Sequence, residues 1–421
     1  MAAPNLMQSS ETRVPAMRPE VAPARSKGVR LAIVSTHPIQ YYAPVFRALA
    51  VSGSVIPRVF FTWSQTADGP VFDPGFGTRF SWDVPLLEGY EYEFVPNIAK
   101  DPGSHHFIGI RNPGLIPAIS RWGADAILVY GWKLQSHLSA LRHFKGRIPV
   151  LFRGDSTLLD PSSSIRKVVR RAFLHWIYSH VDVGIAVGQN SRDYYAWCGM
   201  GPERIAFAPH SVDTRRFGDT GGGYTERARR WRSDLGIPEE STAILFAAKF
   251  QPLKEPLLLL DAFIDLKSSA HLIFVGNGEM EPALRERARG KSNVHFLPFQ
   301  NQGDMPVVYR LGDIYVLPSN RETWGLGMNE AMASGRAMIA SSRVGAARDL
   351  IQAGETGWVF ESGNRQDLIR ILGTAVAAGR DRLRRMGEQA LKMSADWSTE
   401  AAANGIAAAA LRACTERAAA R

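Results

Sequence analysis

The chain has 421 residues, 45% hydrophobic and 21% charged, a composition typical of globular proteins with two or three domains. No stretch approaches the roughly 18 uninterrupted apolar residues of a membrane span. Two cysteines are too few for a disulfide framework or a zinc site, which favours a reducing cytosol. The formal net charge of +10 predicts an anionic partner, and residues 164–232 hold twelve Arg and Lys against six Asp and Glu.

Residues 1–28 contain four prolines and no apolar run of the kind found in a secretory signal, so we expect a disordered leader there. From Val29 the sequence alternates short β-rich runs with helical patterns, which indicates a parallel sheet covered by helices. The strands of this first series are expected at 30–35, 55–61, 126–130, 150–153, 183–187 and 205–208.

A second alternating series follows a Gly- and Arg-rich stretch whose composition suits a linker. Its strands are expected at 243–247, 271–275, 294–297, 314–317, 337–340 and 357–360, with helices near 257–266, 281–288 and 328–334. The prediction is an α/β protein of two doubly wound, Rossmann-like domains that face each other across a cleft. The expected bounds are 29–217 for the first domain, 218–240 for the linker, 241–395 for the second domain and 396–421 for an Ala-rich closing helix.

The segment 317–335 is the richest in functional residue types. A strand ends at its start, its loop carries Glu322 and two glycines, and the helix that follows carries Glu330. Free amides at a helix N-terminus suit a phosphate, and carboxylates suit sugar hydroxyls. The ligand that has both parts is a nucleotide sugar. Taken alone, the two glutamates fit surface charges equally well.

Two other loops follow strands of the second series, where open α/β sheets bind ligands. Lys249 and Lys254 come after its first strand, and Asn277 lies between glycines after its second. Lysines there could neutralise a diphosphate as point charges, although loop lysines are normally only solvated.

These residues resemble a known family. The stretch 322–330 is similar to the E-x7-E motif of the retaining GT-B glycosyltransferases of family 4, also called glycosyl transferases group 1. The resemblance covers nearly the whole chain from Val29. Further matches lie at 275–278, at Pro298, at 318–319, at Gly345, and at 210–213 with Phe217.

The resemblance implies a role for each matching position. Glu322 would hold hydroxyls of the donor sugar and Glu330 the ribose, while Lys249 and Lys254 would grip the diphosphate. The family usually has Arg where this chain has Lys249. The remaining substrate-binding candidates are the diphosphate-binding amides at Gly325, Leu326 and Gly327, with Thr323 and Asn277 near the donor, and the backbone around Pro298 for the base.

The first series matches the family less well. Its first strand runs into 35–42, where relatives often have a glycine-rich turn, and there His37 could bond donor or acceptor or merely cap a helix. Arg153 and Asp155 end a later strand where many relatives carry a histidine, and they are the candidates for acceptor or sugar binding. Aromatic residues such as Tyr41 and Trp82 could stack on an acceptor sugar, although such side chains more often fill cores.

No metal site is expected, because the chain has neither an Asp-x-Asp pair nor His-Glu-x-x-His spacing. The leaving diphosphate would then be stabilised by helix amides and lysines. No cofactor is expected beyond the nucleoside-diphosphate sugar itself.

The residues from 164 onward form one amphipathic helical pattern. Its apolar stripe comprises Ile165, Val168, Val169, Ala172, Phe173, Trp176 and Ile177, and its basic residues off the stripe are Arg166, Lys167, Arg170 and Arg171. We expect the stripe to pack on the sheet. The basic face is either simply solvated or in contact with an anionic membrane surface.

The sequence therefore predicts a cytoplasmic, metal-independent, retaining hexosyltransferase. Whether the enzyme also binds peripherally to the inner face of the cell membrane stays open. Its acceptor would be a glycan, plausibly a lipid-linked or surface-polysaccharide intermediate. Two alternatives stay open: a sugar-nucleotide epimerase of the same architecture, which would release free product, and a basic nucleic-acid-binding protein. The chain shows no recognised nucleic-acid-binding module, so no nucleic-acid partner is expected.

Overall fold

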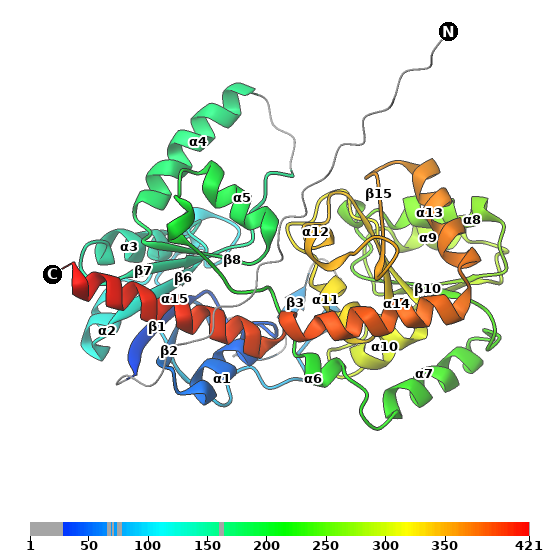
Figure 1. Cartoon of the computed structure of the whole chain (residues 1–421), viewed down its shortest axis with the longest axis horizontal. Helices are drawn as coiled ribbons and strands as arrows, with labels where there is room; N and C mark the ends of the chain where they lie inside the picture. The colour runs from blue at the N-terminus through cyan, green and yellow to red at the C-terminus, as the bar shows by residue number, and fades with distance from the viewer. Residues whose placement is uncertain (1–27, 65–68, 70, 74–77, 160–163, 421) are drawn as a thin grey trace, which may run out of the picture.

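The computed structural model describes residues 28–64, 69, 71–73, 78–159 and 164–420. The expected leader lies outside these residues except for Gly28. Two parallel sheets form the framework, one from each half of the chain (Figure 1). The predicted fold class is thereby confirmed.

The first sheet has seven parallel strands in the order β5-β2-β1-β6-β7-β8-β9. Six of them match the sequence prediction to within one residue at each end, because each is a short run of β-branched and aromatic residues buried on both faces. The strands are β1 (Val29–Ser35), β2 (Val55–Phe61), β5 (Glu91–Phe94), β6 (Ala126–Tyr130), β7 (Val150–Arg153), β8 (Val183–Ala186) and β9 (Ile205–Phe207).

The prediction missed β5 and a small antiparallel hairpin, β3 (Val71–Asp73) with β4 (Thr78–Phe80). Strand β5 is an edge strand with two exposed residues, so its sequence lacks the apolar run of its neighbours. The helices of this half are α1 (Ala43–Ser52), α2 (Leu115–Trp122), α3 (Gln135–Phe144), α4 (Ser164–Ser179) and α5 (Gln189–Trp197), with short 3-10 turns at Phe107–Gly109 and Pro202–Arg204.

The second sheet has six parallel strands in the order β12-β11-β10-β13-β14-β15. All six were predicted to within one residue: β10 (Ala243–Ala247), β11 (His271–Val275), β12 (Val294–Leu297), β13 (Ile314–Leu317), β14 (Ala337–Ser341) and β15 (Gly357–Phe360). The helices around it are α8 (Pro256–Leu266), α9 (Glu281–Arg287), α10 (Met305–Leu311), α11 (Leu326–Ala333), α12 (Ala347–Leu350), α13 (Arg365–Ala377) and α14 (Gly379–Met393).

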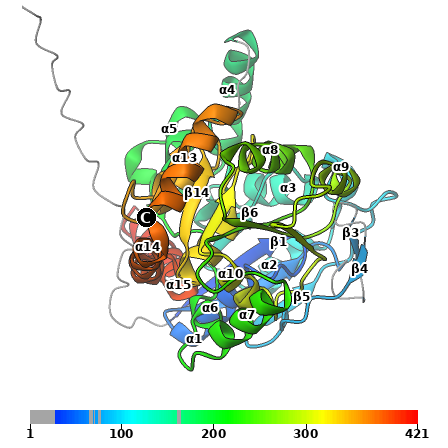
Figure 2. The same cartoon turned by 90° about the vertical axis from the view of Figure 1, so that its right-hand side faces the viewer.

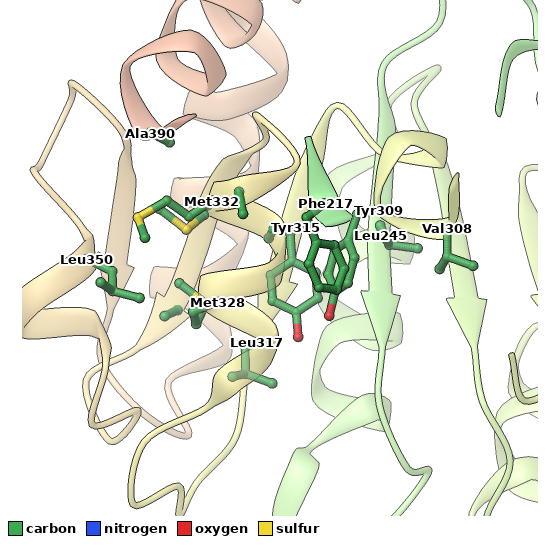
Figure 3. Close-up of a cluster of buried hydrophobic side chains, with 14 of the residues drawn as sticks. Phe217, Leu245, Val308, Tyr309, Tyr315, Leu317, Met328, Met332, Leu350 and Ala390 are labelled. Carbon is green, nitrogen blue, oxygen red and sulfur yellow. The ribbon is translucent and has the colours of Figure 1, made fainter. Parts of the chain in front are cut away.

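The segment between the sheets is more structured than a linker. It holds α6 (Thr214–Phe217) and α7 (Gly223–Asp234), and α7 packs on α10 by burying Ala228. Phe217 enters the core of the second half, where its ring lies 5.9 Å from that of Tyr309 (Figure 3). Because Phe217 and Ala228 are buried in the core of the second half, the segment that connects the two sheets is packed against that half.

The chain ends by returning to the first half. After a 3-10 turn at Ser394–Trp397, helix α15 (Thr399–Ala419) runs back along the first sheet and packs on α1 and β9 (Figure 1). Its alanines allow close approach, and at Gly405 an added Cβ would lie 2.4 Å from the carbonyl oxygen of Phe207. The chain thus passes between the two halves twice, and α15 joins the end of the second half to the first.

The apolar stripe predicted on α4 does not pack on the sheet as a whole. Leu174, Ile177 and Tyr178 are buried, but Val168 is 70% and Val169 67% exposed, and the rings further along remain more than 40% exposed. The prediction was wrong because the N-terminal half of α4 extends past the edge of the domain (Figure 2), and no other element of the described chain covers it there. The side chains of residues 164–167 lie outside the described part of the chain.

Candidate nucleotide-sugar site

A cavity of about 360 Å³ lies between the two halves, at the carboxyl ends of the second sheet's strands. Gln40, Tyr41 and Trp82 line it from the first half. The second half contributes most of the predicted residues, namely Lys249, Lys254, Glu322, Gly325, Leu326, Gly327 and Glu330. The E-x7-E segment and the two lysines are thus brought together as predicted.

The loop between β13 and α11 places the two glutamates. Gly325 has a φ of 100°, a left-handed conformation that favours glycine, and α11 begins directly after it. At Gly327 an added Cβ would lie 2.4 Å from the Tyr315 hydroxyl, so a side chain there would close the approach to the first turn. No side chain caps α11, which leaves its first amides facing the cavity.

Glu322 and Lys254 form an ion pair at the cavity wall. Their side chains are 18% and 24% exposed, so the pair is shielded from solvent but still reachable by a ligand. The backbone of Glu322 is fixed from both sides, since its N–H donates to Arg343 and its carbonyl accepts from Gly345. Two backbone hydrogen bonds to the loop 343–345 thus fix the main chain at Glu322, and Lys254 holds its carboxylate.

Glu330 is buried deeper, at 3% exposure. Its Oε2 accepts a hydrogen bond of 2.6 Å from the Tyr309 hydroxyl, while Oε1 is buried and has no hydrogen-bond partner among the described residues. Burial raises the pKa of Glu330 above its usual value, although the Tyr309 bond and the charge of Arg216 act in the opposite direction. The side chains of Tyr41 and Gln302, which line the same cavity, also act on Glu330 in the direction that lowers its pKa. A ligand hydroxyl at Oε1 would complete this polar environment.

The rings of Tyr309 and Tyr315 meet edge to face beside Glu330, with their centroids 5.3 Å apart, and Figure 3 shows both hydroxyls on the same side of the cluster. Burial and the Glu330 charge raise the pKa of both phenols, so they stay neutral hydrogen-bond donors. Sequence analysis did not single out these tyrosines, because one lies on a strand and the other on a helix that read as ordinary core elements. Gln300 and Gln302, which also line the cavity, were missed for lack of any pattern.

Asn277 and Pro298 support the cavity from behind and do not line it. The Asn277 side chain accepts a bond of 2.6 Å from the Phe299 amide, which fixes the loop after β12, and the Pro298 carbonyl accepts from Gln300. Gly276 lets the loops after β10 and β11 approach, since an added Cβ would lie 2.2 Å from the Ala248 carbonyl oxygen. These contacts position Lys249 and Phe299.

Thr323 and Asp155 join the two halves next to Glu322. The Thr323 hydroxyl donates to the Asp155 carboxylate at 2.7 Å. Arg153 points elsewhere: it is 4% exposed, and its guanidinium donates to the carbonyls of Ala208 and Pro209. Arg153 therefore does not line this cavity: burial and two hydrogen bonds to backbone carbonyls hold its guanidinium within the first half.

His37 does not line the cavity either. Its ring packs edge-on against Trp63 at 5.9 Å, and burial lowers its pKa to about 4, so it is neutral at physiological pH. The buried Nδ1 has no hydrogen-bond partner in the described part of the chain. Its neighbours Gln40 and Tyr41 reach the cavity instead.

Comparisons with known proteins agree with this geometry. Residues 228–393 match the family Glycosyl transferases group 1. A D-inositol 3-phosphate glycosyltransferase of Corynebacterium glutamicum (strain R) is 26% identical over 290 residues, which is 65% of this chain and 67% of that protein. Across several such relatives the alignments span about half to two thirds of the relatives' length.

Solved structures show the same fold. The Anabaena protein Alr3699/HepE, solved in complex with UDP and glucose, gives a TM-score of 0.63 at 17% identity, covering 93% of this chain and 99% of that one. Sucrose-phosphate synthase from Thermosynechococcus elongatus gives 0.67 at 17% identity, covering 93% and 100%. The family match and the fold together support a glycosyltransferase of the GT-B type.

Because Glu330 is a buried carboxyl group at the candidate site, we expect its replacement to stabilise the fold and to weaken ligand binding. A carboxyl whose pKa is raised by folding stabilises the protein less as the pH rises from the ordinary carboxyl value through the folded-state pKa. Glu330→Gln should therefore raise the denaturation midpoint at neutral pH and flatten its pH dependence, while weakening nucleotide binding. Urea titrations from mildly acidic to neutral pH measure this.

Glu355→Gln is the control, because Glu355 is an exposed glutamate of the same half outside the cavity. It should change neither the midpoint nor its pH dependence. A Glu330→Gln protein that is less stable than wild type at neutral pH would contradict the assignment of a strained, buried carboxylate.

Proposed function

We propose that the protein transfers a hexose-type sugar from a nucleoside diphosphate to an acceptor with retention of the anomeric configuration. The observation that carries the proposal is the joint lining of one cavity by Glu322, Glu330, two lysines and the free first turn of α11. Each kind of group matches one part of a nucleotide sugar: carboxylates for hydroxyls, cations and amides for phosphates. The E-x7-E resemblance supports family 4 and retention.

In this proposal Glu330 accepts a hydrogen bond from a ribose hydroxyl through its unpartnered Oε1. Glu322 binds hydroxyls of the transferred sugar, and Lys254 meets the diphosphate. Because Lys254 and Glu322 are paired with each other at the cavity wall, a donor that bears both phosphate and hydroxyls would replace one ion pair with two separate contacts. The pair keeps both charges compensated until the donor arrives.

We further propose that transfer needs no metal ion. The described lining of the cavity holds only the two carboxylates Glu322 and Glu330 and no histidine, and Glu322 is paired with Lys254, which gives a poor ligand set for a metal ion. The developing charge on the leaving diphosphate would be met by Lys249, Lys254 and the α11 amides, a preorganised arrangement that is worth a few kcal/mol per donor, on the order of 3. Retention would follow from attack on the face that the diphosphate leaves.

The acceptor proposed is a glycan, lipid-linked or part of a surface-polysaccharide intermediate, and the place of action is the cytoplasmic side of the cell membrane. No helix of the described residues is both long and apolar enough to cross a bilayer. Contact with the membrane would therefore be peripheral, with the basic residues of α4 meeting anionic headgroups.

The decisive first experiment is a thermal-shift screen of nucleoside diphosphates and their sugars. A ligand at 100 times its dissociation constant should stabilise the protein by about 2.7 kcal/mol. Product analysis with the selected donor then separates a transferase, which needs an acceptor, from an epimerase, which releases an isomerised sugar nucleotide. Absence of any nucleotide response would overturn the proposal.

Glu322→Ala should abolish transfer and leave folding intact, because the side chain lies at a cavity wall and fills no core. Release of nucleoside diphosphate from the selected donor measures activity, and the denaturation midpoint measures stability. Glu355→Ala is the matched control and should retain activity. A folded Glu322→Ala protein with near-wild-type turnover would exclude the proposed role.

Lys254→Ala should weaken binding of the sugar nucleotide and of the free diphosphate, with little change for the nucleoside alone, because the lysine is expected to meet phosphates only. Calorimetry with the three ligands measures this. Lys291→Ala, an exposed lysine of the same half, serves as control. Equal losses for nucleoside and diphosphate would place Lys254 away from the phosphates.

A chelator should leave transfer unchanged. Among the described residues, the one group of side chains spaced like metal ligands is Asp101, His105 and His106, and none of them lines the cavity. A metal bound there would not touch the donor. Loss of activity in chelator with rescue by magnesium or manganese would overturn the metal-free proposal.

A further inference from the structure

On helix α4 the sequence pattern and the environment disagree. Figures 1 and 2 both show its N-terminal half extending beyond the rest of the first half of the molecule. Every described side chain from Val168 to Phe173 is exposed, whereas Leu174, Ile177 and Tyr178 anchor the C-terminal half in the core. A helix that is held at one end and apolar at the other presents a surface that water does not favour.

The exposed apolar residues form a single ridge. We define the α4 ridge as Val168, Val169, Phe173 and Trp176, which are 70%, 67%, 47% and 42% exposed. Their spacing puts them on one side of the helix. The ring of Phe173 lies 5.9 Å from that of Trp176 and 5.7 Å from that of Trp132, so the base of the ridge is fixed while its far end is open.

Positive charge flanks the ridge, and within the described part of the chain no carboxylate pairs with it. Arg170 and Arg171 are exposed, and within the described residues neither forms an ion pair; Arg171 donates to the carbonyl of Trp197. The arginines of α7 behave differently, because Arg227 pairs with Asp304 and Arg232 with Asp313. Among the described side chains, Arg170 and Arg171 thus add positive charge at α4 that no ion pair offsets, and an anionic surface would be complementary to it.

The ridge also lies close to the proposed donor site. Arg170 lines a hollow of about 590 Å³ together with Arg321, Arg343 and Leu253. Arg321 immediately precedes Glu322 in the sequence, and Leu253 immediately precedes Lys254. The side of the molecule that carries α4 thus contains the rim of the cavity.

We propose that the α4 ridge inserts into the headgroup and upper acyl region of an anionic bilayer, with the flanking arginines at the phosphates. The inference rests on the proposed function in one respect: it supplies the surface from which a membrane-borne acceptor would enter the cavity. It differs from docking by a basic face alone, because Val168, Val169, Phe173 and Trp176 contribute burial that salt does not screen.

The test compares apolar and charged contributions on vesicles made from equal parts of phosphatidylcholine and phosphatidylglycerol. Val168→Ser combined with Val169→Ser removes apolar area without changing charge and should weaken cosedimentation about tenfold or more at low and high salt alike. Arg170→Gln should weaken it at low salt only. Vesicles of phosphatidylcholine alone should bind the wild type less.

Val51→Ser is the matched control, because Val51 is 80% exposed at the end of α1 and lies outside the ridge. It should bind vesicles as the wild type does. The proposal is overturned if the wild type fails to bind anionic vesicles at low salt, or if the double serine variant binds equally well. It is also overturned if light scattering shows a ridge-dependent dimer that does not bind vesicles.

Nucleotide thermal shifts on the same preparations separate this inference from the proposed function. Nucleotide binding without vesicle binding removes the ridge proposal only. Vesicle binding by a protein that responds to no nucleotide supports the ridge and removes the glycosyltransferase proposal.

Discussion

The backbone at Gly325 is the constraint on which the site depends. A strand must end, a loop must turn, and a helix must begin with its amides toward a ligand, all within the few residues from Leu317 to Leu326. The left-handed φ of 100° at Gly325 makes that turn, and an added Cβ would lie 2.9 Å from a methyl group of Leu317. Because α11 starts there, Glu330 is directed into the core beside Tyr309 while Glu322 stays at the wall.

The same segment also holds the two halves together, so donor binding and domain arrangement share residues. Thr323 bonds Asp155, and Asn329, which accepts from the Trp324 indole, donates to the carbonyl of His210. On helix α12, the Asp349 carboxylate accepts from the backbone N–H of Gln189, and burial raises the pKa of Asp349 to about 6. A ligand that moves the loop 318–325 must therefore act on contacts that cross the cleft.

Much of this arrangement was readable from the sequence, for reasons that are local. Buried parallel strands read as short β-branched runs, so twelve of the strands in the two large sheets were placed to within a residue. The glutamates, the lysines and the helix start follow strand ends, where the fold binds ligands. The confirmed part is the fold and the gathering of these residues; their roles remain proposals.

What sequence could not give depends on tertiary contacts. Arg153 looked like a ligand-binding cation, yet the carbonyls of Ala208 and Pro209 take its donors. Tyr309 and Tyr315 meet Glu330 only because α10 and β13 pack side by side. The amphipathic pattern of α4 indicated a buried stripe, but periodicity states only that a helix has an apolar side and does not say whether protein, lipid or water faces it.

The net charge of a sequence likewise does not say which basic side chains are paired in the fold. Arg227 and Arg232 of α7 pair with carboxylates, whereas the exposed arginines of α4 and the cavity residue Lys254 lie where an anion can reach them. Among the described residues, Arg170 and Arg171 of α4 are therefore basic side chains that an anionic surface can reach, and Lys254 can meet a phosphate only by exchanging its contact with Glu322.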